Sequence, residues 1–224
     1  MNRQELAKMI DHTNLKAYAD ADAMRKLCDE ARENGFAMVA VNSAQTALCK
    51  RLLKDTPVHV GAAISFPLGQ TTVETKVFET ENAIQNGADE IDYVVNQTAV
   101  KDGDWTYVRD EMERIAATCR KGGAICKVIF ENCYLTKEEI VRLAEIAREV
   151  KPDFIKTSTG FGTGGATVED VKLMRDTVQG AVKVKAAGGI RDWATCRVMI
   201  EAGAERIGTS AGLKILAEFD ETEA

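Results

Sequence analysis

The feature that most restricts the fold is a regular alternation of short apolar runs with amphipathic segments. Strand-like runs cover residues 9–13, 36–42, 58–65, 89–95, 124–131, 153–158, 181–187 and 205–210. Between them, segments such as 21–35, 71–87 and 137–150 repeat apolar residues every three or four positions and often end at glycine, the usual residue after a helix. Strict alternation of strand and helix predicts a parallel sheet with right-handed crossovers.

A weak internal repeat favours closure of that sheet. Residues 82–94 and 198–210 share a helix end, Gly-Ala, an acidic residue and Ile, and their glycines, Gly87 and Gly203, are 203 − 87 = 116 positions apart in a chain of 224. Two halves of four strand–helix units predict a single-domain (β/α)8 TIM barrel over residues 1–224. A doubly wound open sheet is the alternative, although the G-x-G-x-x-G turn typical of that fold does not follow the first strand.

Composition restricts partners and location. The 29 basic and 35 acidic residues are dispersed and give a net charge of −6, so we expect no nucleic-acid partner. The charged first 15 residues and the lack of any run of eighteen apolar residues predict no signal peptide, no membrane span and a cytoplasmic location. Six cysteines without a C-x-x-C pair, and only two histidines, predict reduced packing thiols and no metal or disulfide framework.

Strand parity sends charged side chains into the barrel. Alternate strand residues face the helices and are apolar, as Ile91, Tyr93 and Val95 are. The same parity turns toward the axis Glu90, Asp92, Lys127, Glu131, Phe154, Lys156, Ser158, Lys183 and Lys185. An unpaired buried charge is costly, so these groups form either a catalytic cluster or an ion-pair network that serves only stability.

Position along the strands selects the catalytic candidates. Asp92, Lys156 and Lys185 lie near the C-terminal ends of their strands, where barrel enzymes build active sites, whereas Lys127 sits deeper. Burial and a neighbouring ammonium group both favour a neutral lysine, which attacks carbonyl carbons. A carboxylate beside it transfers protons, directly or through water. The pattern therefore predicts an enzyme with Lys156, Lys185 and Asp92 at its centre.

Glycine-rich loops predict a phosphate site on the same rim. Residues 158–165 and 188–189 contribute glycines, and Ser210, Ala211 and Gly212 open a short helix after the last strand. Backbone amides at such positions bind phosphate dianions, although glycines also mark simple tight turns. We expect a small phosphorylated molecule as the ligand.

Six motifs resemble the deoxyribose-phosphate aldolase family of class I aldolases, in the family's order and over nearly the whole chain. They are IDHTNLK (10–16), EIDYVVN (90–96), KVIFENCYLT (127–136), FIKTSTGFGTGGAT (154–167), VKAAGGIR (184–191) and RIGTSAG (206–212). The pairing of FIKTSTGF with VKAAGGI is specific.

The resemblance implies a function and residue roles. The reaction would be reversible cleavage of 2-deoxy-D-ribose 5-phosphate into D-glyceraldehyde 3-phosphate and acetaldehyde, without metal or organic cofactor. Lys156 would form the Schiff base, Lys185 would lower its pKa, and Asp92 would transfer protons. The implied substrate contacts are Asp11, Thr13, Lys127, Gly160, Gly188, Gly189, Ser210 and the amide of Ala211. A homo-oligomer is compatible with the sequence, which does not specify an assembly.

The chain departs from the family's common pattern at positions without a catalytic role. These are Asn14, Ala17, Ala40, Ser43, Thr163 and Ala211, together with a tail, 219–224, that lacks a C-terminal tyrosine. Many members carry cysteine at the position of Ala40. Many also carry a second serine at the position of Ala211, and the loss of that hydroxyl is expected to alter phosphate affinity.

Other residues are expected to be structural, and two other functions stay open. His12 should face the helices as a hydrogen-bonded residue, Glu131 should pair with an interior lysine, and Trp105 and Trp193 should anchor helix starts. The rival functions are a transaldolase-like Schiff-base barrel acting on ketose phosphates and a catalytically silent sugar-phosphate-binding barrel.

Overall fold

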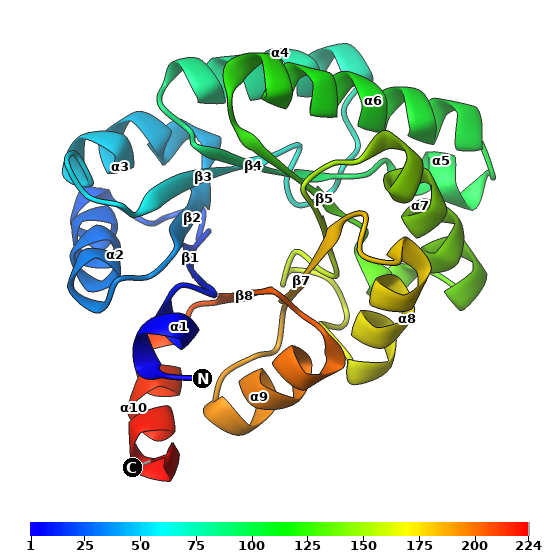
Figure 1. The fold of residues 1–224 in the computed structure, drawn as a ribbon. Helices are drawn as coiled ribbons and strands as arrows, with labels where there is room; N and C mark the ends of the chain where they lie inside the picture. The colour runs from blue at the N-terminus through cyan, green and yellow to red at the C-terminus, as the bar shows by residue number, and fades with distance from the viewer. Residues whose placement is uncertain (224) are drawn as a thin grey trace.

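The computed structural model describes residues 1–223 and contains a closed barrel of eight parallel strands, in which each strand pairs with the next and β8 pairs with β1 (Figure 1). The strands are β1 Ile10–Asn14, β2 Met38–Asn42, β3 His59–Ile64, β4 Glu90–Val94, β5 Ile125–Ile129, β6 Phe154–Lys156, β7 Lys183–Ala187 and β8 Arg206–Thr209. The predicted (β/α)8 barrel is confirmed, and closure between β1 and β8 rules out the open sheet.

The helices form a ring around the barrel (Figure 1). They are α1 Arg3–Ala7, α2 Ala21–Asn34, α3 Thr46–Leu52, α4 Val73–Gln85, α5 Gln97–Lys101, α6 Trp105–Gly122, α7 Lys137–Val150, α8 Val168–Val178, α9 Trp193–Ala202 and α10 Gly212–Glu223, with short 3-10 turns η1 Ser43–Gln45 and η2 Asn132–Tyr134. The sequence predicts a short helix after β8, but the helix found there, α10, is 12 residues long.

Local side-chain chemistry sets the helix boundaries. Thr136 begins α7 with a capping box, in which its side chain accepts from the amide of Glu139 while Glu139 accepts from the amide of Thr136. Gly35 and Gly123 end α2 and α6 with φ of 68° and 71°, a left-handed conformation that glycine adopts without strain.

The aromatic residues that open two helices are packing anchors, as predicted. Trp193 is buried at the start of α9 and its ring meets Phe219 of α10 edge-on, with centroids 4.9 Å apart. Trp105 starts α6 and packs against the hydrophobic core. Aromatic side chains at these positions hold the helices against their neighbours.

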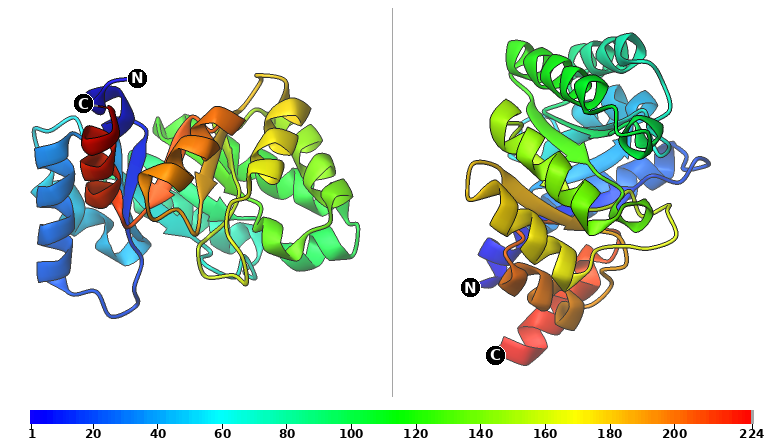
Figure 2. Two further views of the ribbon diagram at one scale, coloured as in Figure 1. Left: turned by 90° about the horizontal axis from the view of Figure 1, so that it is seen from below. Right: turned by 90° about the vertical axis from the view of Figure 1, so that its right-hand side faces the viewer.

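The two ends of the barrel differ. Both termini lie side by side at one end, and the loop after β6 lies at the other (Figure 2). Arg3 of α1 pairs with Asp220 of α10 at 2.9 Å, which joins the two ends of the chain. Within residues 1–223, no helix is long and apolar enough to cross a membrane.

Strand parity separates the apolar layer from the polar interior. Ile91 and Tyr93 of β4 are fully buried in the hydrophobic core between strands and helices, whereas Glu90 and Asp92 of the same strand join the ion pairs inside the barrel. His12 follows the rule as predicted: its Nε2 lies 2.7 Å from Oε2 of Glu30 on α2, in the helix layer. The alternation of β4 and β1 thus delivers carboxylates to the axis.

Candidate active site

Three lysines converge on one carboxylate at the barrel axis. Oδ2 of Asp92 lies 2.8 Å from Nζ of Lys156 and 2.8 Å from Nζ of Lys185, and Oδ1 lies 2.7 Å from Nζ of Lys127. All four side chains are almost completely buried. The pKa of Asp92 is held well below its usual range: burial opposes ionisation, but the three ammonium groups outweigh it.

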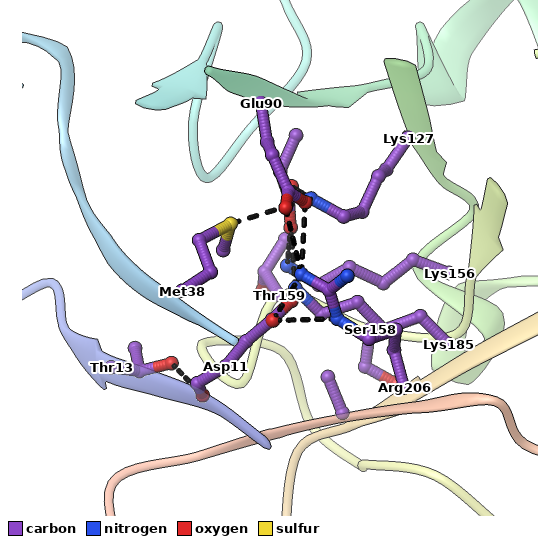
Figure 3. Close-up of polar contacts among 12 residues, drawn as sticks. Asp11, Thr13, Met38, Glu90, Lys127, Lys156, Ser158, Thr159, Lys185 and Arg206 are labelled. Carbon is purple, nitrogen blue, oxygen red and sulfur yellow. Dashed lines mark hydrogen bonds and ion pairs between the residues drawn. The ribbon is translucent and has the colours of Figure 1, made fainter. Parts of the chain in front are cut away.

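A second layer of charges lies beneath Asp92. Asp11 contacts Nζ of Lys185 at 2.5 Å and Nη2 of Arg206 at 2.6 Å. Glu90 pairs with Lys127, and its Oε1 lies 2.9 Å from Nη2 of Arg206. Figure 3 shows the lysine and arginine side chains reaching from their strands toward the carboxylates of Asp11 and Glu90. The interior is therefore one connected network.

The charges of this network do not balance. Four buried cations, Lys127, Lys156, Lys185 and Arg206, are joined to three carboxylates, Asp11, Glu90 and Asp92, which leaves 4 − 3 = +1 when these seven groups are ionised. His59, which is half exposed, adds a further positive charge when it is protonated, because its Nδ1 lies 2.8 Å from Oε1 of Glu90. Excess charge in a dry interior is unfavourable. Loss of one proton from one lysine balances the network.

Lys156 is the lysine whose environment favours that loss. Burial lowers the pKa of Lys156 to about 8, with Lys185 and then Lys127 adding to the shift and Asp92 opposing it. The pKa of Lys127 moves the other way: burial opposes its charge, but Asp92, Glu90 and Asp11 together raise it above its ordinary value. Lys127 thus stays an ammonium group, and Lys156 is poised to become a free amine near neutral pH.

Lys156 also lies where a ligand can reach it. It contributes to the wall of a cavity of about 310 Å³ at the C-terminal ends of the strands. The other walls come from the loops that contain residues 13–16, 159–161, 187–191 and 208–210. A small molecule that enters this cavity meets the amine at its base, which is the usual arrangement in barrel enzymes.

Close packing of two loops requires glycine on the cavity rim. Gly188 has φ of 87°, and a Cβ atom there would lie 3.0 Å from Cα of Gly165 and 3.2 Å from Cβ of Ser158. The amide of Ala166 donates to the carbonyl oxygen of Gly188 at 3.1 Å. The glycines therefore bring the loops after β6 and β7 together and leave backbone exposed to the cavity, as anion-binding loops do.

The sequence-predicted residues fall into three places. Thr13, Lys156, Gly160, Gly188, Gly189 and Ser210 line the cavity. Asp11, Asp92, Lys127 and Lys185 lie buried in the network described above. Ala211 lines a neighbouring cavity that shares Ser210, and its amide donates to Oγ1 of Thr209 at 2.9 Å.

The expectation that Glu131 neutralises an interior lysine is wrong. Glu131 has φ of 57°, so the chain turns before its side chain can enter the barrel. Its Oε1 accepts from the amide of Thr159 at 3.1 Å, and its Oε2 contacts the hydroxyl of the same residue. Glu131 instead anchors the loop after β6 to the end of β5.

Sequence reasoning missed Arg206, which joins Asp11 to Glu90. The internal repeat carries the signal that would have found it: Glu90 and Arg206 are 206 − 90 = 116 positions apart, the same offset as Gly87 and Gly203. Equivalent positions of the two halves thus hold opposite charges, and they pair.

Lys16 and Arg191 were also missed. They add cationic side chains to the cavity wall and end the motifs IDHTNLK and VKAAGGIR.

Comparison with known proteins connects this geometry to a family. The model of the DeoC/LacD family aldolases matches residues 6–218. The chain belongs to the DeoC/LacD family of aldolases.

Relatives in this aldolase family match over almost their full length. The deoxyribose-phosphate aldolase of Lactobacillus acidophilus is 59% identical over 94% of this chain and 89% of the relative. That of Thermococcus kodakarensis is 53% identical over 96% of this chain and 97% of the relative. A solved tetrameric structure of the deoxyribose phosphate aldolase from Aeropyrum pernix has a TM-score of 0.91 at 30% identity, over 100% of this chain and 94% of that chain.

Membership of this aldolase family gives the network a chemical context. An aldolase must stabilise the electron pair released when a carbon–carbon bond breaks, and a protonated imine on lysine does so. A buried lysine that loses its proton near neutral pH is suited to form that imine. Within residues 1–223, no three His, Cys, Asp or Glu side chains are arranged to hold a metal ion.

Proposed function

We propose that this aldolase reversibly cleaves 2-deoxy-D-ribose 5-phosphate into D-glyceraldehyde 3-phosphate and acetaldehyde through a Schiff base on Lys156. The observation that carries the proposal is the position of Lys156: its Nζ lies 2.8 Å from Oδ2 of Asp92, and the side chain borders the cavity. The curated relatives that are 51–59% identical and bear the name of this activity support the same substrate.

The proposed reaction has three stages: imine formation, carbon–carbon cleavage and hydrolysis. The neutral amine of Lys156 attacks C1 of the open-chain sugar to give a carbinolamine, which takes up a proton and loses water to leave an iminium ion. The C2–C3 bond then breaks, its electron pair passes toward the iminium nitrogen to give an enamine, and the C3 hydroxyl loses its proton as the new aldehyde forms. Protonation of the enamine at C2 and hydrolysis release acetaldehyde and the free lysine.

Asp92 is the group that we assign to proton transfer. Its carboxylate lies beside Lys156 but does not line the cavity, so a water molecule would carry the proton between Asp92 and the C3 hydroxyl. Lys185 would keep the pKa of Lys156 low and hold Asp92 in place. Each of the three residues thus has a separate task.

The phosphate group would bind at the rim. We assign its contacts to the backbone of Gly160, Gly188, Gly189 and Ser210, with Thr13 on the adjoining strand β1. The amide of Ala211 would join only after it releases Oγ1 of Thr209. Lys16 and Arg191 would contribute positive charge to the same end of the cavity.

Reduction with borohydride in the presence of acetaldehyde tests the proposal. The expected product is an ethyl group on Lys156, located by peptide mass mapping, and the Lys156→Ala variant should form no adduct. The matched control is Lys183→Ala, which removes an exposed lysine of the neighbouring strand and should label normally. An adduct on Lys127 or Lys185 with Lys156 unmodified would overturn the assignment.

Substrate assays separate the rival functions. A transaldolase-like enzyme would cleave a ketose phosphate in preference to 2-deoxyribose 5-phosphate. A silent binding barrel would bind the sugar phosphate without turnover and without a trapped adduct. The proposed enzyme turns over the deoxy sugar and is trapped by borohydride.

We also propose that the chain forms homo-oligomers. The tetramer described for the relative from Aeropyrum pernix supports this, at 30% identity over the whole of this chain. Light scattering during gel filtration would give the mass in solution, and a mass of 24.4 kDa at micromolar protein would contradict the proposal.

A further inference from the structure

A second buried ion pair lies outside the barrel, close to the proposed active site. Lys76 of α4 and Glu111 of α6 are fully buried, and Nζ of Lys76 lies 2.5 Å from Oε1 of Glu111. The two helices pack against each other over β4 (Figure 1). No charge of this pair belongs to the interior network, so it serves another purpose.

The pair holds the backbone at the end of β4. Nζ of Lys76 donates to the carbonyl oxygen of Val94 at 2.7 Å, and Oε2 of Glu111 accepts from the amide of Asn96 at 3.0 Å. Lys76 also lies 5.9 Å from the ring centroid of Tyr93. Three of the four residues that follow Asp92 thus contact this one pair.

These contacts hold the backbone after Val94 in place, as hydrogen bonds to neighbouring strands would if β4 were longer. The strand β4 ends at Val94, and the side chain of Asn96 already caps α5 by accepting from the amide of Ala99 at 3.1 Å. Between the two elements the chain has to turn immediately above Asp92. The Lys76–Glu111 pair fixes the backbone on both sides of that turn.

Stability alone is a weak reason for such a pair. Apolar side chains of similar volume often stabilise a buried position as well as an ion pair does or better. An apolar pair, however, can neither donate to the carbonyl of Val94 nor accept from the amide of Asn96. What the ion pair adds is a defined position for the end of β4.

We propose that Lys76 and Glu111 are positioning residues that fix the end of β4 and so aim the Asp92 carboxylate at the Lys156 amine. The inference rests on the proposed function, which gives Asp92 its role in proton transfer. Proton transfer depends strongly on distance and direction, and a displacement of about 1 Å can slow a reaction on the order of a hundredfold. Formation of the imine at Lys156 needs no such alignment.

The test compares two steps of the reaction in the Lys76→Met/Glu111→Leu double variant. Exchange of the methyl hydrogens of acetaldehyde with D2O reports proton transfer on the imine, and borohydride trapping reports its formation. We expect exchange and kcat for cleavage to fall by about tenfold to a hundredfold. Trapping at Lys156 and KM for 2-deoxyribose 5-phosphate should stay close to those of the parent protein. Tm should fall by several degrees, because the carbonyl of Val94 and the amide of Asn96 lose their partners.

A matched control replaces an ion pair that joins two helices without touching a strand end. Nζ of Lys137 on α7 lies 2.5 Å from Oδ1 of Asp170 on α8. The Lys137→Met/Asp170→Leu variant should exchange at the parental rate. If the first double variant does not fold, Glu111→Gln keeps the size and one acceptor, and it should show the same selective loss to a smaller degree.

The outcomes separate this inference from the proposed function. Normal trapping with normal exchange in the folded Lys76→Met/Glu111→Leu variant would overturn the positioning role alone. An equal loss in the Lys137→Met/Asp170→Leu control would also overturn it, because any lost helix contact would then have the same effect. Failure of the parent protein to be trapped at Lys156 would instead remove the proposed function.

Discussion

Lys156 and Lys185 contact the same oxygen atom, since the Nζ atoms of both lie 2.8 Å from Oδ2 of Asp92. Two ammonium groups held to one oxygen repel each other, and the network already has an excess of at least one positive charge. The lysine with fewer carboxylate contacts loses its proton more easily. Lys185 has a second carboxylate, Asp11 at 2.5 Å, whereas Lys156 has only Asp92 and the cavity.

The rate of imine formation should therefore follow the titration of Lys156. We expect the rate of trapping with acetaldehyde to rise with pH through an apparent pKa of about 8 in the parent protein. Lys185→Leu should move that pKa upward, because the neighbouring positive charge is lost and Asp92 then attracts the Lys156 proton alone. The measurement is the initial trapping rate over a pH range of roughly two units on either side of that pKa.

The control for this shift is Lys183→Leu, on the same strand. Lys183 shares the inward parity of Lys185, but it is exposed rather than buried in the interior as the sequence predicts, because it begins β7; its Nζ lies over the ring of Phe154, 5.6 Å from the centroid. Its removal should leave the profile in place. If Lys185→Leu also leaves the profile in place, burial alone sets the pKa of Lys156.

Asp92→Asn should separate imine formation from carbon–carbon cleavage. Loss of the carboxylate removes the charge that raises the pKa of Lys156, so the amine is neutral at lower pH and trapping continues. Cleavage should slow on the order of a hundredfold or more, the usual scale for loss of a positioned acid or base. Single-turnover cleavage measures this, with Tm as the control for folding, and full activity would exclude Asp92 from the mechanism.

Protonation of Glu90 should make the folded protein less stable as the pH falls into the acid range. Burial opposes its ionisation, but Lys127, His59 and Arg206 outweigh burial and hold the pKa of Glu90 well below its ordinary value. A carboxyl group with a lowered folded pKa stabilises the protein above its unfolded pKa of about 4.3, and this contribution is lost as the pH falls toward the folded pKa.

Glu90→Gln should accordingly lower Tm at neutral pH and flatten its decline from about pH 4.5 to 2. Glu74→Gln is the control, because Glu74 pairs with Arg114 on the surface and such pairs contribute little. Parallel Tm curves for the parent protein and Glu90→Gln over the acid range would contradict the assignment.

Gly165→Ala should weaken recognition of the phosphate. A Cβ atom at Gly165 would lie 2.2 Å from the carbonyl oxygen of Gly188, so the backbone of the two loops has to separate. We expect KM for 2-deoxyribose 5-phosphate to rise about tenfold or more, while kcat/KM for unphosphorylated 2-deoxyribose changes less. Gly180→Ala is the control: no atom lies within 4 Å of the added Cβ, but its φ of 77° strains alanine away from the cavity, so Tm should fall while KM stays unchanged. Equal losses for both sugars would show that the loops do not bind phosphate.

Two sequence patterns were enough to predict the barrel and the inward direction of Asp92, Lys156 and Lys185. They are the alternation of strand and helix segments and the alternation of apolar and polar residues along each strand. Both depend on local order: residues two apart on a strand share a face, and parallel strands place their C-terminal ends on one rim. The depth of Lys127 followed from the same count, and the structure places it against Glu90 and Asp92.

The residues that sequence reasoning missed depend on long-range contacts. Glu131 has inward parity, but the left-handed turn at its own position redirects it to Thr159, 28 positions away. The pairing of Arg206 with Asp11 crosses 195 positions and exists only because β8 closes onto β1. Lys76 and Glu111 look like ordinary surface charges of two helices until those helices pack together over β4.

Ala40 should protect the enzyme from its own product. Ala40 of β2 is almost completely buried and pairs with Thr13, which lines the cavity, so we expect its side chain to lie near the proposed substrate. An enamine on Lys156 that adds to a second acetaldehyde and then loses water leaves an unsaturated iminium ion. A thiolate beside it would attack the conjugated carbon, forming a C–S bond as a proton adds to the adjacent carbon. Alanine at this position, where many family members carry cysteine, cannot react in this way.

The parent protein should therefore keep its activity in concentrated acetaldehyde longer than the Ala40→Cys variant. Among the six cysteines, five are buried and Cys133 is partly exposed beside the loop after β6, with Sγ 2.7 Å from the position of a Cβ atom at Gly162. Residual activity against time, with intact mass and peptide mapping, should show a cross-link to the introduced thiol in the variant and none in the parent. The Cys133→Ala variant tests the remaining accessible thiol. Equal inactivation of parent and Ala40→Cys, or a substrate-derived bridge at Cys133 of the parent, would show that alanine at position 40 gives no protection.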